Sequence, residues 1–297
     1  MTESRQPAPS LPAGIPSFSR ILVVTDFSAP SVAAAPLAAL LAEYYRSFIV
    51  VAHVIATDSA VEGAELQQQG DSIRSAEAQM QDFVTRSPLG EYEHETVIRQ
   101  GPIWEALAEI VEERRIDLIV LGTHGRSGVG KLLLGSVAQR IFSLAPCPVL
   151  SVSPRARRPW TPGDKLTRIL YATDFSDHSL KALPYALSLA RVSEAELLLL
   201  HAPERPEPIS NEIILGYQQH LGALIPPQHT AWCRFDTLVT PGDPARAIVD
   251  AAADNSVDLV VIGAKAYEGS LAHFEVPLSI AYRVVAHAPC PVLRVRS

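Results

Sequence analysis

Arg20-Ile-Leu-Val-Val-Thr-Asp-Phe-Ser28 occurs a second time in the chain, as Arg168-Ile-Leu-Tyr-Ala-Thr-Asp-Phe-Ser176, and this repeated stretch decides the fold. In both copies a short apolar run of the kind that forms a buried strand ends in Thr-Asp-Phe-Ser. Two further segments recur in the same order: Ile116-Asp-Leu-Ile-Val-Leu-Gly122 returns as Val257-Asp-Leu-Val-Val-Ile-Gly263, and Ala145-Pro-Cys-Pro-Val-Leu150 returns as Ala288-Pro-Cys-Pro-Val-Leu293. The chain therefore contains one folding unit twice.

The repeats predict where the domains begin and end. We expect a flexible tail over residues 1–18, a first domain over 19–153, a linker over 154–166 and a second domain over 167–297. Proline is frequent in the tail and in the linker, which is typical of segments between compact domains.

Each copy alternates strand and helix signals. In the first copy the expected strands are Ile21–Thr25, Phe48–Ile55, Glu95–Arg99, Asp117–Leu121 and Val149–Val152, and the expected helices are Ala33–Tyr45, Ser72–Thr85, Ile103–Arg114 and Val137–Leu144. Nearly continuous apolar strands separated by helices predict a parallel sheet that is buried on both faces. The predicted fold class is α/β, with two tandem doubly wound, Rossmann-like five-stranded sheets in the strand order 3-2-1-4-5. Ligands of such sheets bind outside the carboxyl ends of the strands, where the strand order reverses between strands one and four.

Composition limits the classes of function. With 47% hydrophobic and 19% charged residues, the 297-residue chain is predicted to be globular, and its net charge of −7 does not favour binding to nucleic acid. The three cysteines form no C-x-x-C pair, which favours a reducing compartment. We find no apolar run of the ~18 residues that a membrane span needs and no signal-peptide core, so we expect a cytoplasmic protein without a membrane partner.

The stretch from Gly122 through Gly125 to Gly135-Ser136 follows a predicted strand and leads into a predicted helix. Glycines let the backbone approach a ligand closely, and a helix start offers unpaired N–H groups, so the stretch predicts a phosphate cradle. The segment Gly125 to Leu132 nearly matches the Gly-x-x-x-x-Gly-Lys-Ser/Thr phosphate loop, but Leu132 replaces the hydroxyl that would bind Mg²⁺.

Asp26 and Asp174 end the first strand of each copy, and two interpretations of these carboxylates stay open. Each carboxylate could hold the start of the following helix, or it could accept hydrogen bonds from a ribose or a base at the edge of the crevice. The repeat-equivalent His53 and His201 are expected to line the crevice or to serve the structure. A metal site built from distant histidines, such as His124 or His178, is the weaker alternative.

The pattern Gly122-x2-Gly125-x9-Gly135-Ser136, together with Thr-Asp-Phe-Ser and Pro-Cys-Pro-Val, resembles the universal stress protein family. The resemblance covers essentially the whole chain after the tail, as a tandem pair of family domains. It implies that the first domain binds ATP, ADP or AMP, and it allows Mg²⁺ to accompany the nucleotide. The implied contacts are Asp26 to adenosine, Val54 to adenine, Gly122 on the ribose side, and Gly125, Gly135, Ser136 and Val137 to the phosphates.

The second copy departs from the family pattern. It has Ala266 in place of the second glycine and Leu278-Ser279 in place of Gly135-Ser136, with Pro277 removing a backbone donor. We therefore expect the second domain to bind ATP weakly or not at all. In the first copy, Arg126 and Lys131 either neutralise phosphate or are solvated cations of the loop.

The leading hypothesis is a stress-response protein that binds ATP or AMP as a regulatory ligand and passes the signal to an unidentified protein partner. We expect the two domains to pair through their fifth strands, Val149–Val152 and Val292–Val295, and the tandem chain to form a homodimer. The alternatives are a slow ATPase, for which the sequence reveals no catalytic residue, and a structural interaction module that binds no nucleotide.

Overall fold

The structure is a computed structural model that describes residues 11, 14–56, 66–123, 134–156, 159–204, 209–265 and 279–296, with side chains of the second helix described from residue 72. Gly125, Arg126, Lys131 and Leu278 therefore lie outside the described residues, as does His124. In the described part of the chain, no helix is both long enough and apolar enough to cross a membrane.

The first domain alternates strands and helices as the sequence predicts. Its elements are β1 (Arg20–Val24), α1 (Ala29–Tyr45), β2 (Phe48–Ala56), α2 (Leu66–Arg86), the short 3-10 turn η1 (Pro88–Glu91), β3 (His94–Gly101), α3 (Ile103–Glu113), β4 (Leu118–Gly122), α4 (Ser136–Leu144) and β5 (Val149–Val152). Every strand and helix expected in this half is present, with ends that differ by a few residues.

The second domain repeats this order. Its elements are β6 (Arg168–Ala172), α5 (Asp177–Leu180), α6 (Leu183–Ser193), β7 (Glu196–His201), α7 (Asn211–Ala223), η2 (Pro227–His229), β8 (Phe235–Val239), α8 (Pro244–Asp254), β9 (Leu259–Ala264), α9 (Ile280–His287) and β10 (Val292–Arg296). The helix that follows the first strand is single in the first domain and divided into α5 and α6 in the second.

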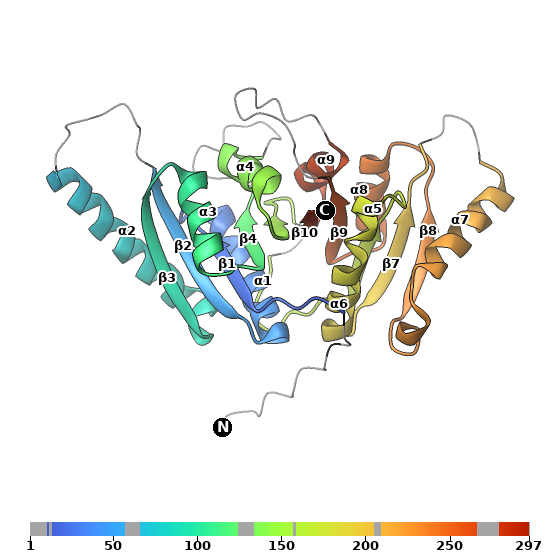
Figure 1. The fold of residues 1–297 in the computed structure, drawn as a ribbon, viewed down its shortest axis with the longest axis horizontal. Coiled ribbons are helices and arrows are strands. Elements are labelled where there is room, and N and C mark those ends of the chain that lie inside the picture. The colour runs from blue at the N-terminus through green and yellow to red at the C-terminus, as the bar shows by residue number, and fades with distance from the viewer. Residues whose placement is uncertain are drawn as a thin grey trace.

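The ten strands of the described ranges form one sheet in the order β3-β2-β1-β4-β5-β10-β9-β6-β7-β8. Each half therefore has the predicted order 3-2-1-4-5. Strands within each half are parallel, while β5 and β10 pair antiparallel, with Leu150 opposite Leu293. The two domains thus meet side by side at their fifth strands, as expected, and Figure 1 shows the helices arranged on both sides of the sheet.

Two buried apolar clusters cover the two faces of this sheet, and each cluster runs through both domains. One cluster packs α1, α2, α6 and α7 against the sheet. The other packs α3, α4, α8 and α9 against the opposite face. Apolar side chains that alternate between the faces of a strand serve both clusters, and for this reason the strands read as continuous apolar runs.

Parts of the predicted tail and linker belong to the core. The Phe18 side chain is 1% exposed, and its ring lies 5.1 Å from the ring of Tyr45 and 5.8 Å from that of Tyr185. In the linker, Trp160 and Leu166 are buried. The packed chain therefore begins before residue 19, because Phe18 fills a space between a helix of each domain.

Candidate functional site

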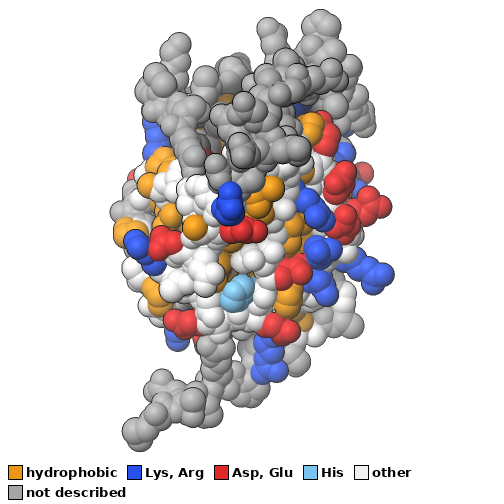
Figure 2. Space-filling view, turned by 90° about the vertical axis from the view of Figure 1, so that its left-hand side faces the viewer, with side chains coloured by type: hydrophobic (Ala, Val, Ile, Leu, Met, Phe, Trp, Pro, Cys, Tyr) orange, Lys and Arg blue, Asp and Glu red, His pale blue; other side chains and the backbone are white. Residues whose placement is uncertain are grey.

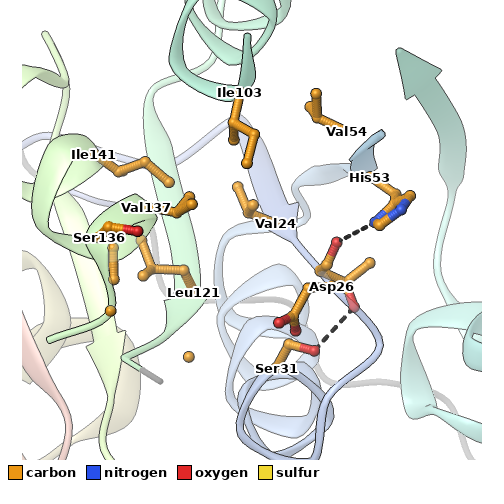
Figure 3. Close-up of a pocket in the computed structure, with 14 residues that line it drawn as sticks. Val24, Asp26, Ser31, His53, Val54, Ile103, Leu121, Ser136, Val137 and Ile141 are labelled. Carbon is orange, nitrogen blue, oxygen red and sulfur yellow. Dashed lines mark hydrogen bonds between the residues drawn. The ribbon is translucent and has the colours of Figure 1, made fainter. Parts of the chain in front are cut away.

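A cavity of about 280 Å³ opens between the carboxyl ends of β1 and β4, where the strand order reverses. Six of the seven predicted site residues line it: Asp26, Val54, Gly122, Gly135, Ser136 and Val137. The seventh, Gly125, lies outside the described residues. Figure 3 shows Asp26 and Ser31 on one side of this cavity and Ser136 and Val137 on the other.

The turn after β1 is held by side-chain hydrogen bonds. The hydroxyl of Thr25 lies 3.0 Å from that of Ser31 and accepts a 3.0 Å hydrogen bond from the backbone N–H of Phe27. Phe27 adopts a φ of 61°, a left-handed conformation that non-glycine residues seldom take. This turn brings Asp26 and Ser31 to the same side of the cavity.

Asp26 has the first of the two roles that the sequence left open, that of holding the start of the following helix. Its Oδ1 accepts hydrogen bonds of 3.0 Å from the backbone N–H and 2.5 Å from the hydroxyl of Ser28, the residue that precedes α1. The carboxylate therefore fixes the entrance to α1, in the manner of an Asx turn. Asp26 also lines the cavity, so its carboxylate lies within the candidate site.

His53 is fixed by the backbone of the first strand. Its Nδ1 lies 2.8 Å from the carbonyl oxygen of Thr25, and its ring centroid lies 4.4 Å from that of Phe27. This bond ties the end of β2 to the end of β1. His53 thus supports the turn and also lines the cavity, as the sequence predicted for a crevice histidine.

Gly122 has a packing role in addition to its place in the cavity. A Cβ atom at this position would lie 2.5 Å from the backbone carbon and oxygen of Pro30 and 2.8 Å from the amide nitrogen of Ser31. Glycine therefore allows the end of β4 to lie directly against the first turn of α1.

The opposite wall is the first turn of α4. Gly135 precedes this helix, its N–H donates to the carbonyl of Thr123 at 2.9 Å, and among the described residues the helix start has no side-chain cap. The first N–H groups of a helix have no partner within the helix, and the helix dipole adds positive potential there. Ser136, Val137 and Ala138 line the cavity, so this anion-attracting turn borders it.

Apolar side chains form the rest of the wall, and the sequence did not single them out as site residues: Val24, Ile103, Leu121 and Ile141. Thr25 and Ser31 also went unrecognised. The recurrence of Thr25 as Thr173 and of Ser31 as Ser179 was the signal that could have revealed them, since both pairs make the same hydroxyl–hydroxyl contact.

A second cavity, of about 460 Å³, lies at the equivalent place in the second domain. Asp174, His201 and Gly263 line it, as their counterparts line the first cavity. The helix wall differs, because the hydroxyl of Ser279 accepts a 3.2 Å hydrogen bond from the N–H of Tyr282 and so caps α9.

In the described ranges, no group of three or more His, Cys, Asp or Glu side chains is arranged to hold a metal ion. On the face formed by α2 and β3, basic and acidic side chains are interspersed (Figure 2), and several of them pair, as Arg99 does with Glu113 and Arg114 with Glu95.

The sequence of this chain matches a known protein family twice. The sequence model of the universal stress protein family matches residues 17–153 and again residues 165–296. The chain belongs to the universal stress protein family. It carries two family domains in tandem, and the double match accounts for the internal repeat.

Individual family members match single domains. A universal stress protein of Thermus aquaticus is 30% identical over 135 residues, which make up 46% of this chain and 98% of that protein. The universal stress protein MJ0531 of Methanocaldococcus jannaschii is 31% identical over 140 residues, 46% of this chain and 82% of its own. A crystal structure of a universal stress protein from Archaeoglobus fulgidus covers 93% of this chain and 98% of its own, with a TM-score of 0.72 and 20% identity, and so shares the fold.

Proposed function

We propose that the first domain binds an adenine nucleotide, ATP, ADP or AMP, as a regulatory ligand in a stress response. The observation that carries the proposal is the pairing, across one cavity, of a fixed carboxylate with a helix start whose N-cap residue, Gly135, has no side chain to satisfy its donors. A carboxylate suits the hydroxyls of a ribose, and a helix N-terminus suits phosphate oxygens. A ligand that carries both a ribose and a phosphate would contact the carboxylate and the helix start at the same time.

The apolar wall supports an aromatic base as the third part of the ligand. Val24, Val54 and Ile103 line this cavity, and Figure 3 shows Val54 on the side away from Ser136 and Val137. Small-molecule sites typically combine such apolar surface with a few polar groups that fix the orientation. In this proposal Val54 contacts the base, Asp26 and Gly122 the ribose, and Gly125, Gly135, Ser136 and Val137 the phosphates.

A binding role is favoured over hydrolysis. The carboxylate of Asp26 accepts a hydrogen bond from the hydroxyl of Ser28, and the ring of His53 is hydrogen-bonded to the carbonyl of Thr25. Both side chains therefore stabilise the turn beside the cavity. A hydrolase needs a group that positions the attacking water. Mg²⁺ enters this proposal as a counter-ion of the ATP phosphates, without a protein site of its own.

In the proposal the bound nucleotide controls the association of the chain, either with a second copy as a homodimer or with a regulatory protein in the cytoplasm. Ligands shift such an equilibrium only as far as they bind one state more tightly than the other. Size-exclusion chromatography with light scattering, with and without ATP, measures this coupling. An unchanged mass, with no partner gained in ATP, would reject the homodimer part of the proposal.

The nucleotide is tested with the purified full-length protein. Mass spectrometry of the denatured sample identifies any co-purified nucleotide, and calorimetry measures the affinity for ATP. We expect Gly135→Leu to weaken ATP binding by about tenfold or more, which corresponds to about 1.4 kcal/mol, because the new side chain blocks the start of α4.

Adenosine serves as the matched control ligand for this variant. It lacks the phosphates that Gly135 is proposed to accommodate, so Gly135→Leu is expected to leave adenosine binding in the first cavity unchanged. Equal loss of ATP and adenosine would show a damaged fold rather than a blocked phosphate site. No binding of ATP at millimolar concentration would reject the proposal and leave the interaction module, while turnover that Asp26→Ala abolishes would support the ATPase.

A further inference from the structure

The second domain duplicates the polar floor of the first cavity almost atom for atom. The hydroxyls of Thr173 and Ser179 lie 2.8 Å apart, and Asp174 Oδ1 accepts hydrogen bonds of 3.0 Å from the N–H and 2.6 Å from the hydroxyl of Ser176. His201 Nδ1 lies 2.8 Å from the carbonyl of Thr173. The corresponding distances in the first domain are 3.0, 3.0, 2.5 and 2.8 Å.

The close contact at the base of the cavity is duplicated as well. A Cβ atom on Gly263 would collide with the backbone of His178 and Ser179, as one on Gly122 would collide with the first turn of α1. Burial raises the pKa of Asp174, but the hydrogen bonds from Ser176 and Ser179 together outweigh this effect, so its pKa lies below the ordinary value. At neutral pH an ionised carboxylate therefore lines this cavity, as an acceptor for ligand hydroxyls.

The helix wall of the second cavity differs from that of the first, because a side chain caps the start of α9. The Ser279 hydroxyl accepts the N–H of Tyr282, so one of the first-turn donors of α9 is already satisfied within the protein. Ile280 lines the second cavity where the first has Val137, so an apolar side chain stands at this position in both. The difference is the donor that Ser279 has already satisfied, which leaves a phosphate group less in exchange for its hydration.

The second cavity has one more carboxylate than the first. Glu204 lines it where the alignment of the copies puts Ala56 in the first domain, so its described lining includes two carboxylates and one ammonium group, that of Lys265. The ammonium group offsets the added carboxylate, so the net charge matches that of the described lining of the first cavity, where Asp26 is the charged residue. A ligand with several hydroxyl groups would meet an additional hydrogen-bond acceptor.

The second cavity nevertheless has room for a ligand. Its volume of about 460 Å³ lies within the range of roughly 300–1,000 Å³ that is usual for small-molecule sites. Ala202 stands where the first domain has Val54, and this smaller side chain widens the side on which the base is proposed to bind.

We propose that the second cavity binds a nucleoside without phosphate groups, for which adenosine is the probe. The proposal rests on the nucleotide site proposed for the first domain, because it takes the recognition of the ribose from the shared floor. One chain then holds a phosphorylated and an unphosphorylated ligand at the same time, and it responds to the ratio of the two.

The experiment titrates adenosine into the full-length protein that has first been saturated with ATP, with heat or retained radiolabel as the readout. We expect one adenosine to bind per chain in the presence of ATP. Asp174→Asn should weaken this binding about tenfold or more, because an acceptor for the ribose hydroxyls is lost. Asp254→Asn is the matched control, because Asp254 is exposed at the end of α8 and lines neither cavity, and it should leave this binding unchanged.

A second variant tests the cavity without altering its hydrogen bonds. Ala202→Leu places three more carbon atoms on the proposed base side and should abolish adenosine binding in the presence of ATP, while the thermal unfolding curve shows that the fold is intact. Failure of adenosine to bind beside ATP, two ATP molecules bound per chain, or indifference to both Asp174→Asn and Ala202→Leu would overturn the proposal.

The same titrations distinguish this failure from failure of the first site. ATP that binds once per chain and is lost in Gly135→Leu, without any separate adenosine site, supports the first proposal and overturns the second. Adenosine binding that depends on Asp174 although ATP does not bind supports the second cavity and rejects a nucleotide in the first.

Discussion

Arg283 and Asp243 form a two-pronged ion pair, with both guanidinium–carboxylate distances at 2.8 Å, and this pair joins α9 to the residue that caps α8. The alignment of the two copies puts Arg140 and Pro102 at these positions in the first domain, so no such ion pair can form there. In the second domain an ion pair therefore holds the start of α8, whereas the start of the equivalent helix α3 has no such ion pair.

The ion pair predicts a specific dependence of stability on pH. The hydrogen bonds from Arg283 lower the pKa of Asp243, so its contribution is complete above the ordinary Asp pKa of about 3.9 and is lost as pH falls through the lower folded value. Asp243→Asn keeps a capping side chain but removes the charge. We expect urea unfolding to show a small stability gap between the two proteins at pH 6 that closes below about pH 4. A gap that is constant with pH would contradict the role of the charge.

Phe18 predicts that the N-terminal segment stabilises the contact between domains. Its ring packs on Tyr45 of the first domain and Tyr185 of the second, so Phe18→Ala should leave a cavity and lower the free energy of unfolding by about 3–5 kcal/mol. Val32→Ala is the control, because the Val32 side chain is 47% exposed and its loss should change stability by less than about 0.5 kcal/mol. Equal effects in urea unfolding would show that Phe18 is not part of the core.

The packing of Phe18 is a part of the fold that could not be predicted from the sequence. The strand order and the pairing of the fifth strands were predictable, because apolar strands recur in the same order in both copies and parallel sheets obey strict connection rules. The place of Phe18 was not, because its partners come from two distant helices and its own neighbourhood is rich in proline. Burial of this kind leaves no periodic pattern in the sequence.

The candidate site shows the same division. Asp26, Gly135 and Ser136 stand out because glycines and carboxylates at strand ends indicate chemistry, and the structure brings them to one cavity. The second cavity was not predictable, because the replaced glycine indicated only what the domain had lost. Its volume depends on how Ala202 and Ile280 pack, which the sequence does not express as a pattern.

Arg294 and Arg296 lie two residues apart on β10 and should respond oppositely to the same substitution. Arg294 is 2% exposed, its Nε and Nη1 atoms have no hydrogen-bond partner among the described residues, and its guanidinium lies 5.2 Å from the ring centroid of Phe142. Burial lowers its pKa to about 10. Because an unsatisfied buried polar group costs about 1–3 kcal/mol, we expect Arg294→Met to raise the free energy of unfolding by a similar amount.

Arg296→Met provides the contrast. Arg296 Nη1 donates hydrogen bonds of 2.8 Å and 3.3 Å to the carbonyls of Leu144 and Ala145 at the end of α4, across the contact between domains. Loss of these charge-assisted bonds should lower the free energy of unfolding by about 1.5–3 kcal/mol. Urea unfolding of the two variants measures both signs. A destabilised Arg294→Met protein would mean that water or another group satisfies the buried guanidinium.

Gly122→Ala should damage the site and the fold together, because the added Cβ would lie 2.5 Å from the Pro30 carbonyl, where backbone must move. We expect a loss of about 1–3 kcal/mol in the free energy of unfolding, as for other overpacked positions, and weaker binding of ATP and adenosine alike in the first cavity. Gly216→Ala in α7 is the matched control: its Cβ meets no atom within 4 Å, so the change should stabilise the helix by up to about 1 kcal/mol. Chemical denaturation and calorimetry of both variants test this pair, and a Gly122→Ala protein of native stability and affinity would refute the close contact between β4 and α1.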